Sequence, residues 1–205
     1  MRVKGNYVPK RDVLYVKEDI TVKEALDHLN ETGYRCVPVL DKTETKFIGN
    51  LYKVDILEHA HLLDTSVTEL LDDKDSFVYE TSSFFQVFFT IKRLPYIAVL
   101  DENQNFLGIL THSKIFELLE DAWGIHSGSY TITVGTQDYN GAIGKLAKLL
   151  KKYSGIQSLL TLDNNALYVR RLIFTLGKDF PSSHLSDLRE DLEENGFRII
   201  DVQKL

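Results

Sequence analysis

The stretch "GYRCVPVLD" (residues 33–41) combines features of a buried strand with two features that a buried strand seldom has. Residues 36–40 form a continuous apolar run, which is typical of a short strand covered on both faces. Arg35 stands directly before this run, and Pro38 in its middle lacks the backbone N–H that a neighbouring strand would use. We therefore expect a strand whose edge is incompletely paired near its beginning, where a ligand can reach the backbone.

The same pattern occurs twice along the chain. "CVPVLDKTETKFIGNLYKVDIL" (36–57) aligns with "YIAVLDENQNFLGILTHSKIF" (96–116), with one residue fewer in the second turn. Both copies indicate a strand, a polar turn, a second strand and a helix. A repeat of about 60 residues is the length of one supersecondary unit, so the sequence predicts two similar units packed against each other.

Each repeat also begins with a helix. In "TVKEALDHLNETG" (21–33), Thr21 is suited to be the N-cap and Glu24 its capping-box partner. In "SSFFQVFFTIKRL" (82–94), Ser82 or Ser83 is the expected cap. Four phenylalanines within six residues, more than one helix face holds, predict a helix buried on two sides, the alternative being an exposed groove for a partner: Phe84, Phe85, Phe88 and Phe89.

A different arrangement is expected after residue 122. Residues 123–128 are a predicted linker, and residues 129–205 indicate strand, helix, strand, strand, helix and strand, with Asn164-Asn165 as the turn between the middle strands. This βαββαβ order is the ferredoxin-like arrangement. The predicted fold class is therefore α/β (α+β), with repeats over residues 1–62 and 63–122 followed by a ferredoxin-like domain.

Composition limits the function classes. A net charge of −6 over 205 residues disfavours broad binding to nucleic acid or to an anionic membrane. Cys36 is the single cysteine, so no internal disulfide can form and nothing indicates export. No apolar run reaches the roughly 18 residues of a membrane span, and the first residues lack the apolar core of a signal peptide. We expect a cytoplasmic protein with neither a nucleic-acid nor a membrane partner.

The sequence offers no catalytic constellation. It shows no carboxylate pair, nucleophile triad or cluster of metal ligands at an established spacing. His59 and His61 alternate along the chain and do not converge as metal ligands, and Cys36 has no histidine near it in sequence to activate a thiolate. We therefore predict that the protein is not an enzyme and holds no metal or catalytic cofactor.

The duplicated unit, with "GYRCVPVLD" and the turn "GILTHSK" (108–114), resembles a CBS-domain pair. The tail resembles an ACT domain, whose strand-to-helix loop is similar to "DYNGAIGKLAKLL" (138–150). More narrowly, residues 82–116 are similar to the CBS–ACT proteins of Gram-positive bacteria that bind cyclic di-AMP. The resemblance implies a nucleotide-sensing regulator that binds adenosine compounds between the repeats, with the ACT domain relaying or integrating the signal.

The resemblance also implies where a ligand would lie. A nucleotide would contact the strand before a repeat's first helix, the start of the strand at 36–40 and the turn after the glycine. The residues implied for this site are Arg11, Leu14, Tyr15, Arg35, Cys36, Val37, Asp55, Thr111, His112 and Lys114. A further ligand loop of the ACT type, suited to an amino acid, would comprise Asp138, Asn140, Gly141 and Ala142.

This sequence divides the family's nucleotide motif between its two turns. Many members carry a hydroxyl for phosphate and a carboxylate for ribose in each turn, whereas "GNLYKVD" (49–55) has Tyr52 with Asp55, and "GILTHSK" has Thr111 with Lys114. Two phosphodiesters need cationic partners, so the cation at Lys114 favours cyclic di-AMP as the ligand. The alternatives are an AMP or ATP sensor with an amino-acid-binding ACT domain, and a dimerising scaffold with degenerate sites. The resemblance also implies a homodimer.

Overall fold

The computed structural model describes residues 2–137, 140–163 and 169–205. The chain divides into two compact units, the first ending at Ile115 and the second comprising Phe116–Leu205. This division falls upstream of the expected linker at 123–128, and the expected turn at Asn164-Asn165 lies outside the described residues. Within the described part of the chain, no helix combines the length and the apolar character needed to cross a bilayer.

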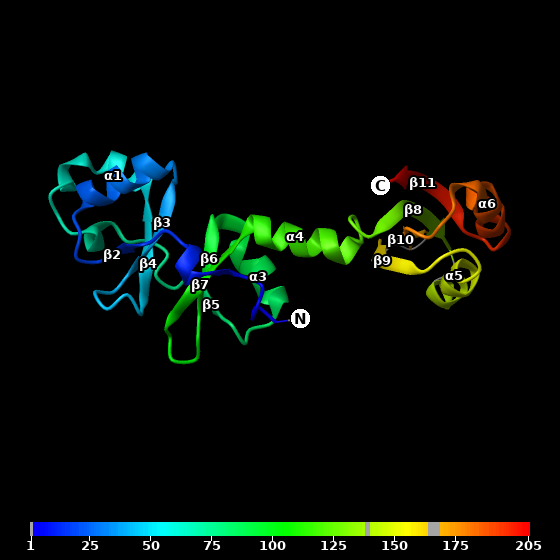
Figure 1. Cartoon of the computed structure of the whole chain (residues 1–205), viewed down its shortest axis with the longest axis horizontal. Helices are drawn as coiled ribbons and strands as arrows, with labels where there is room; N and C mark the ends of the chain where they lie inside the picture. The colour runs from blue at the N-terminus through cyan, green and yellow to red at the C-terminus, as the bar shows by residue number, and fades with distance from the viewer. Residues whose placement is uncertain (1, 138–139, 164–168) are drawn as a thin grey trace. The chain divides into compact units, whose positions relative to one another are not determined.

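The first repeat forms a three-stranded sheet of order β2-β3-β4 with two helices (Figure 1). Its elements are β2 (Val16–Lys17), α1 (Val22–Thr32), β3 (Cys36–Leu40), β4 (Phe47–Tyr52) and α2 (Lys53–Glu58). The predicted cap of α1 is confirmed, since the Thr21 hydroxyl accepts a hydrogen bond from the Glu24 N–H at 3.2 Å and the Glu24 carboxylate accepts one from the Thr21 N–H at 2.8 Å. The capped helix buries its apolar face against the sheet through Val22, Ala25 and Leu29.

The second repeat has the same order of elements and the same strand register. Its elements are β5 (Phe77–Tyr79), α3 (Phe84–Thr90), β6 (Tyr96–Leu100), β7 (Phe106–Thr111) and α4 (His112–Trp123). Val99 lies opposite Gly108 just as Val39 lies opposite Gly49, and the register shifts directly after both pairs. The predicted repeat is confirmed down to this irregularity.

A segment near the beginning of each repeat, upstream of β2 or β5, pairs with the sheet of the other repeat. Strand β1 (Val8–Pro9), in the first repeat, pairs with β7 of the second, where Val8 lies opposite Ile109. Asp72, in the second repeat, bridges Asn50 on β4 of the first through backbone hydrogen bonds of 2.8 and 3.0 Å. We call residues 8–14 and residues 72–73 the first and second lead-in segments. They interlock the repeats around a shared core cluster: Leu40, Ala98, Leu100 and Phe106.

Glycines let both lead-in segments approach the sheets closely. Gly108 has φ of +155°, and a Cβ there would lie 2.0 Å from the carbonyl oxygen of Val8. Gly49 has φ of +152°, and its Cβ would lie 3.1 Å from the carbonyl oxygen of Asp72. Since L side chains rarely adopt these angles, both crossings depend on glycine.

Helix α3 differs from the prediction. Phe84 and Val87 are buried, but Phe85 is 67% exposed and Phe89 is 78% exposed in this chain. The expectation of a helix buried on two sides was wrong, because α3 spans only residues 84–90 and one of its faces is left uncovered. Ser83 is the N-cap residue, although its side chain makes no capping hydrogen bond. Two large aromatic side chains therefore face outward.

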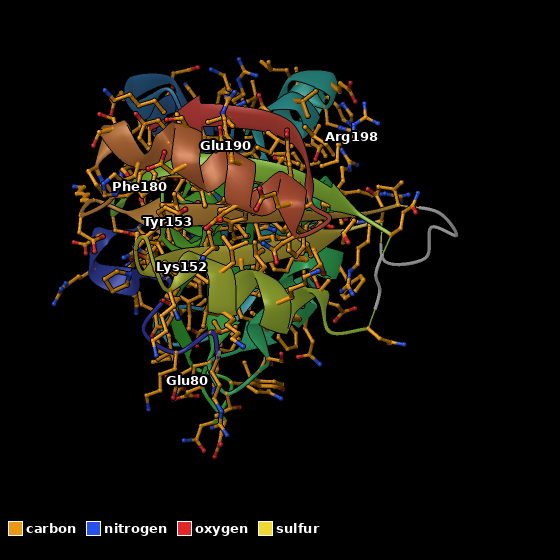
Figure 2. The ribbon with its side chains drawn as sticks, turned by 90° about the vertical axis from the view of Figure 1, so that its right-hand side faces the viewer. Glu80, Lys152, Tyr153, Phe180, Glu190 and Arg198 are labelled. Carbon is orange, nitrogen blue, oxygen red and sulfur yellow. The ribbon has the colours of Figure 1, made fainter. Side chains whose placement is uncertain are left out.

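The second unit has the predicted βαββαβ order and a sheet of order β11-β8-β10-β9. Its elements are β8 (Gly128–Thr136), α5 (Ala142–Leu150), β9 (Ile156–Leu162), β10 (Arg170–Gly177), α6 (Leu185–Glu194) and β11 (Arg198–Lys204). Figure 2 shows α5 and α6 on one face of this sheet, where Lys152 and Tyr153 both donate hydrogen bonds to Asp191, at 3.0 and 2.7 Å. The core between helices and sheet includes Leu146, Leu150, Phe174, Leu188 and Phe197.

Short 3-10 helices lie in the connections: η1 (Lys10–Asp12), η2 (Ala60–Leu62), η3 (Val67–Leu70), η4 (Ile91–Arg93) and η5 (Ser182–His184). The first of them belongs to the lead-in segment of the first repeat, between β1 and β2. It turns the chain from the sheet of one repeat to that of the other.

Candidate functional site

A cavity of about 320 Å³ lies in the first unit where four segments meet. These segments are the first lead-in segment, the start of β3, the start of β6 and the end of β7. We call this cavity the open cleft, and it is lined by Val8, Asp12, Val13, Leu14, Tyr34, Arg35, Cys36, Val37, Pro38, Pro95, Tyr96, Ile109 and Thr111. Both repeats contribute to it, so the cleft exists only when the repeats are packed together.

Several residues implied by the sequence gather in the open cleft: Leu14, Arg35, Cys36, Val37 and Thr111. His112 and Lys114 are not among its lining residues, but they follow Thr111 in the first turn of α4. The ring of His112 places Nδ1 3.2 Å from the carbonyl oxygen of Pro95, and the Lys114 N–H donates to the Thr111 hydroxyl at 3.2 Å. Thr111 therefore joins the wall of the cleft to the start of a helix.

Three further implied residues do not line the open cleft either. Arg11 is exposed and lies 3.5 Å from the carboxylate of Asp12. The Tyr15 hydroxyl donates to Glu44 at 2.6 Å, and its ring packs on the shared core cluster. Asp55 lies elsewhere in the unit, where burial and the nearby charge of Asp72 raise its pKa.

The start of β3 offers backbone groups to the open cleft. Within the described residues, β2 pairs only with Val39 and Leu40, so residues 36–38 have no strand on that side. Pro38 lines the cleft and has no N–H to satisfy. A ligand with a flat hydrogen-bonding edge can therefore use this stretch as a further strand would.

Cys36 lines the open cleft but is not suited to act as a nucleophile. Its side chain is buried, and its Sγ lies 3.5 Å from the hydroxyl of Tyr96. Burial raises the pKa of the Cys36 thiol to about 11, so the thiol stays protonated at neutral pH. A protonated thiol lacks the nucleophilic thiolate.

The mouth of the open cleft carries charge and its interior is largely apolar. Arg35 and Asp12 are the charged side chains among its lining residues, and both are exposed. Val13, Leu14 and Ile109 provide apolar walls. The start of α4 at His112 adds the partial positive charge of a helix N-terminus next to Thr111. This arrangement can hold an apolar, planar group inside and an anion at the mouth.

A larger cavity, of about 550 Å³, lies in the second unit. Among the residues of the expected ACT-type loop, Ala142 lines it, Asn140 and Gly141 do not, and Asp138 lies outside the described residues. The charged side chains that line it are Lys145 on α5 and Arg198 on β11. Arg198 is labelled at the rim of the sheet in Figure 2. We treat the smaller cavity as the candidate site because the implied nucleotide residues gather there.

Sequence reasoning missed part of the open cleft: Val8, Tyr34, Pro95, Tyr96 and Ile109. Most of these are apolar or aromatic and look like ordinary core positions. The alignment of the repeats could have identified two of them, since Pro95 and Tyr96 stand where Arg35 and Cys36 stand in the first repeat. A cleft formed by both repeats should be lined by the start of β6 as well as the start of β3.

The comparisons with known proteins agree on the first unit. A family model of the CBS domain matches residues 3–62 and again 67–121, more than half of the chain. A CBS domain pair/ACT domain protein from Thermotoga maritima is 26% identical, with a TM-score of 0.51 over 60% of this chain and 98% of that one. No curated protein matches the chain significantly.

Two further solved structures are each 20% identical and show a likeness of fold. CbpB in complex with c-di-AMP has a TM-score of 0.54, covering 58% of this chain and 85% of that one. The CBS domain of a bacterial CNNM/CorC family Mg2+ transporter in complex with ATP has a TM-score of 0.51, covering 57% and 85%.

Proposed function

This chain belongs to the CBS-domain family, and from that premise we propose that it is a non-catalytic regulator that senses cyclic di-AMP through the open cleft. The observation that carries the proposal is the cleft itself. It brings together, around one cavity, the start of β3 with its open edge on the β2 side, the hydroxyl of Thr111 and the cation of Arg35. The structural relative CbpB, which binds c-di-AMP, supports the choice of ligand.

The shape of the open cleft suggests how such a ligand is held. A volume of about 320 Å³ is at the lower end of small-molecule pockets, so it suits one nucleoside. The adenine edge would hydrogen-bond to the backbone at residues 36–37, between apolar walls. The phosphodiesters and the second nucleoside would then lie at the mouth, beside Arg35, with His112 and Lys114 close by in the first turn of α4.

An adenine mononucleotide sensor is the second candidate. The relative solved in complex with ATP shares the fold of the CBS pair, and the cleft volume suits one nucleoside. The cation at Lys114, in place of a ribose-binding carboxylate, favours the dianionic dinucleotide over this alternative.

The regulator is proposed to be a homodimer. Val54 and Leu57 on α2, and Phe85 and Phe89 on α3, are large apolar side chains exposed in the single chain. A second copy would remove them from water. The second unit is proposed to relay or integrate the signal, with an amino acid as a ligand of its ACT-type loop.

Calorimetric titration with cyclic di-AMP, AMP and ATP tests the proposed function. We expect cyclic di-AMP to bind most tightly, and Arg35→Ala to weaken it by about 1.5–3 kcal/mol, the scale of a charge-assisted hydrogen bond. That is a roughly ten- to hundredfold loss of affinity. Arg189→Ala, the same substitution at an exposed position of α6, is the matched control and should bind normally.

Three results would count against the proposal. AMP or ATP binding as tightly as cyclic di-AMP would favour the mononucleotide sensor. Absence of binding by all three nucleotides would leave the dimerising scaffold. Arg35→Ala that binds normally but melts several degrees lower would show that Arg35 has a structural role only.

A further inference from the structure

The matching registers of the two repeats define a second cleft. Tyr52 on β4 lies opposite Cys36, and Thr111 on β7 lies opposite Tyr96, so Tyr52 and Thr111 are counterparts. By the same registers, Asn50 is the counterpart of Ile109. The lead-in segments correspond as well, because Val8 pairs with Ile109 and Asp72 with Asn50. The end of β4 and the second lead-in segment should therefore bound a cleft equivalent to the open one.

The walls of this second cleft are joined directly. In the open cleft, Thr111 and the first lead-in segment stand on the walls of the cavity. At the counterpart position, the side chain of Tyr52 reaches from the end of β4 to the second lead-in segment, where its hydroxyl donates a hydrogen bond to the carboxylate of Asp73. A tyrosine ring thus lies where the open cleft has only a threonine.

A buried polar network lies on the same strands as Tyr52, with Cys36 opposite it and Asn50 two residues before it. The Tyr96 hydroxyl donates to Oδ1 of Asn50 at 2.7 Å and lies 3.5 Å from the Sγ of Cys36. Asn50 is fully buried, and its Nδ2 has no hydrogen-bond partner among the described residues. The orphaned amide marks this as a place where a polar group was enclosed without complete pairing, which is unusual in a packed interior.

The second cleft carries acidic residues at two positions where the second repeat has Lys114 and the first lead-in segment has the neutral Val8. Asp55 stands at the position of Lys114, and Asp72 at the position of Val8. Burial and the nearby charge of Asp72 raise the pKa of Asp55. An anionic ligand would meet repulsion from these carboxylates, whereas the second repeat carries the cation of Lys114 at the position of Asp55.

We propose that the side chain of Tyr52 fills the second nucleotide cleft, so that each chain binds a single ligand through the open cleft. The inference rests on the proposed function for the identity of the ligand, but not for the closure of the second cleft. The ring of Tyr52 takes the volume that a ligand would occupy in the second cleft, and the carboxylate of Asp73 holds its hydroxyl in place.

The inference is tested by placing the side chains found at positions 111 and 114 at their counterpart positions in the second cleft. The double variant Tyr52→Thr/Asp55→Lys installs the threonine and lysine that the second repeat carries at 111 and 114. Titration with cyclic di-AMP should give one equivalent per chain for the wild type and a second equivalent for this variant. The matched control is Tyr52→Phe/Asp55→Lys, which changes the same charge but retains the ring, and it should bind one equivalent.

Each outcome decides the inference. Two equivalents in the wild type, or a double variant that takes up no more ligand than its ring-bearing control, would overturn it. If the wild type binds none of cyclic di-AMP, AMP and ATP, the proposed function fails, yet a gain in the double variant over its control would still support closure by Tyr52. If the double variant does not fold, Thr111→Tyr gives a second test: it should abolish binding, and unchanged binding would overturn the inference.

Discussion

The two repeats of the first unit have the same backbone register, but different side chains where their clefts form. The strand pairs coincide position by position, including the irregularity after Val39 and Val99. At the strand ends, however, Thr111 lines an open cleft and Tyr52 closes its counterpart. The comparison teaches that a few backbone positions maintain the frame of the repeat, while single side chains decide whether a cleft is available to a ligand.

The polar turns that follow β3 and β6 are a feature that the two repeats share. Asp41 accepts hydrogen bonds from the N–H groups of Thr45 and Lys46 at 2.7 and 2.8 Å. Asp101, at the same place in the second repeat, accepts from those of Asn103 and Asn105 at 2.8 and 2.7 Å. Each carboxylate thus satisfies the backbone of its turn and sets the start of the next strand.

The largest expected effect is the loss of stability when Gly108 or Gly49, where a lead-in segment passes close to a sheet, is replaced by alanine. Gly108→Ala places a Cβ about 2.0 Å from the Val8 carbonyl oxygen, so β1 must leave β7. We expect the free energy of unfolding to fall by about 5 kcal/mol, from backbone strain and overpacking together. Gly49→Ala, with a distance of 3.1 Å, should cost about 2 kcal/mol. Urea denaturation measures both, and equal losses would show that the two lead-in segments are held alike.

An intermediate effect concerns the aromatic helix of the second repeat. Phe84→Ala removes a side chain that is 1% exposed, and we expect a loss of about 3–4 kcal/mol. Phe89→Ala, at a position 78% exposed, should change the unfolding free energy by less than about 0.5 kcal/mol when measured at a concentration where the protein is monomeric. A large loss for Phe89→Ala under that condition would mean that α3 packs more deeply than the structure shows.

The smallest effect is the pH dependence of the two turns. Hydrogen bonds from the Lys46 N–H and the Thr43 hydroxyl lower the pKa of Asp41 to about 2, below its usual value of about 4. Because the folded pKa is the lower one, this stabilisation is present above about pH 4 and is lost as the pH falls towards 2. The pKa of Asp101 is also lowered, chiefly by the Asn105 N–H.

Denaturation at a series of pH values checks this prediction. Asp41→Asn removes a carboxylate that titrates, so stability should fall less between about pH 4 and pH 2 than in the wild type. The effect should exceed that of Asp101→Asn, because the pKa of Asp41 is lowered as far as about 2. Identical pH curves for Asp41→Asn and the wild type would show that the hydrogen bonds of Asp41 do not depend on its charge.

Much of the fold was predictable because its signals are local. The cap at Thr21 and Glu24, the duplicated turn and the βαββαβ pattern each lie within short stretches of sequence. Helix α3 was predicted wrongly, since four neighbouring phenylalanines do not reveal which of them the rest of the unit will cover. The exposure of Phe85 and Phe89 depends on tertiary packing, about which the local sequence holds no information.

The candidate site was predictable only in part, for a similar reason. Arg35 was conspicuous because a charge precedes an apolar strand, and Leu14 and Thr111 followed from the family resemblance. Tyr96 and Ile109 were missed because an aromatic or aliphatic residue in a buried strand looks like core. The role inferred for Tyr52 emerged only when the strand registers aligned it with Thr111 and showed its hydroxyl on Asp73.

The exchange of lead-in segments between the repeats has a consequence for how freely each half can change. A single repeat on its own would leave its sheet edge uncovered, whereas two identical copies would cover each other's edges across a two-fold axis. The present chain carries such an exchanged pair in one polypeptide. Because its two halves have separate sequences, a mutation in one repeat need not suit the other. The difference between Tyr52 and Thr111 requires this separation, since two identical copies would carry the same residue at both positions.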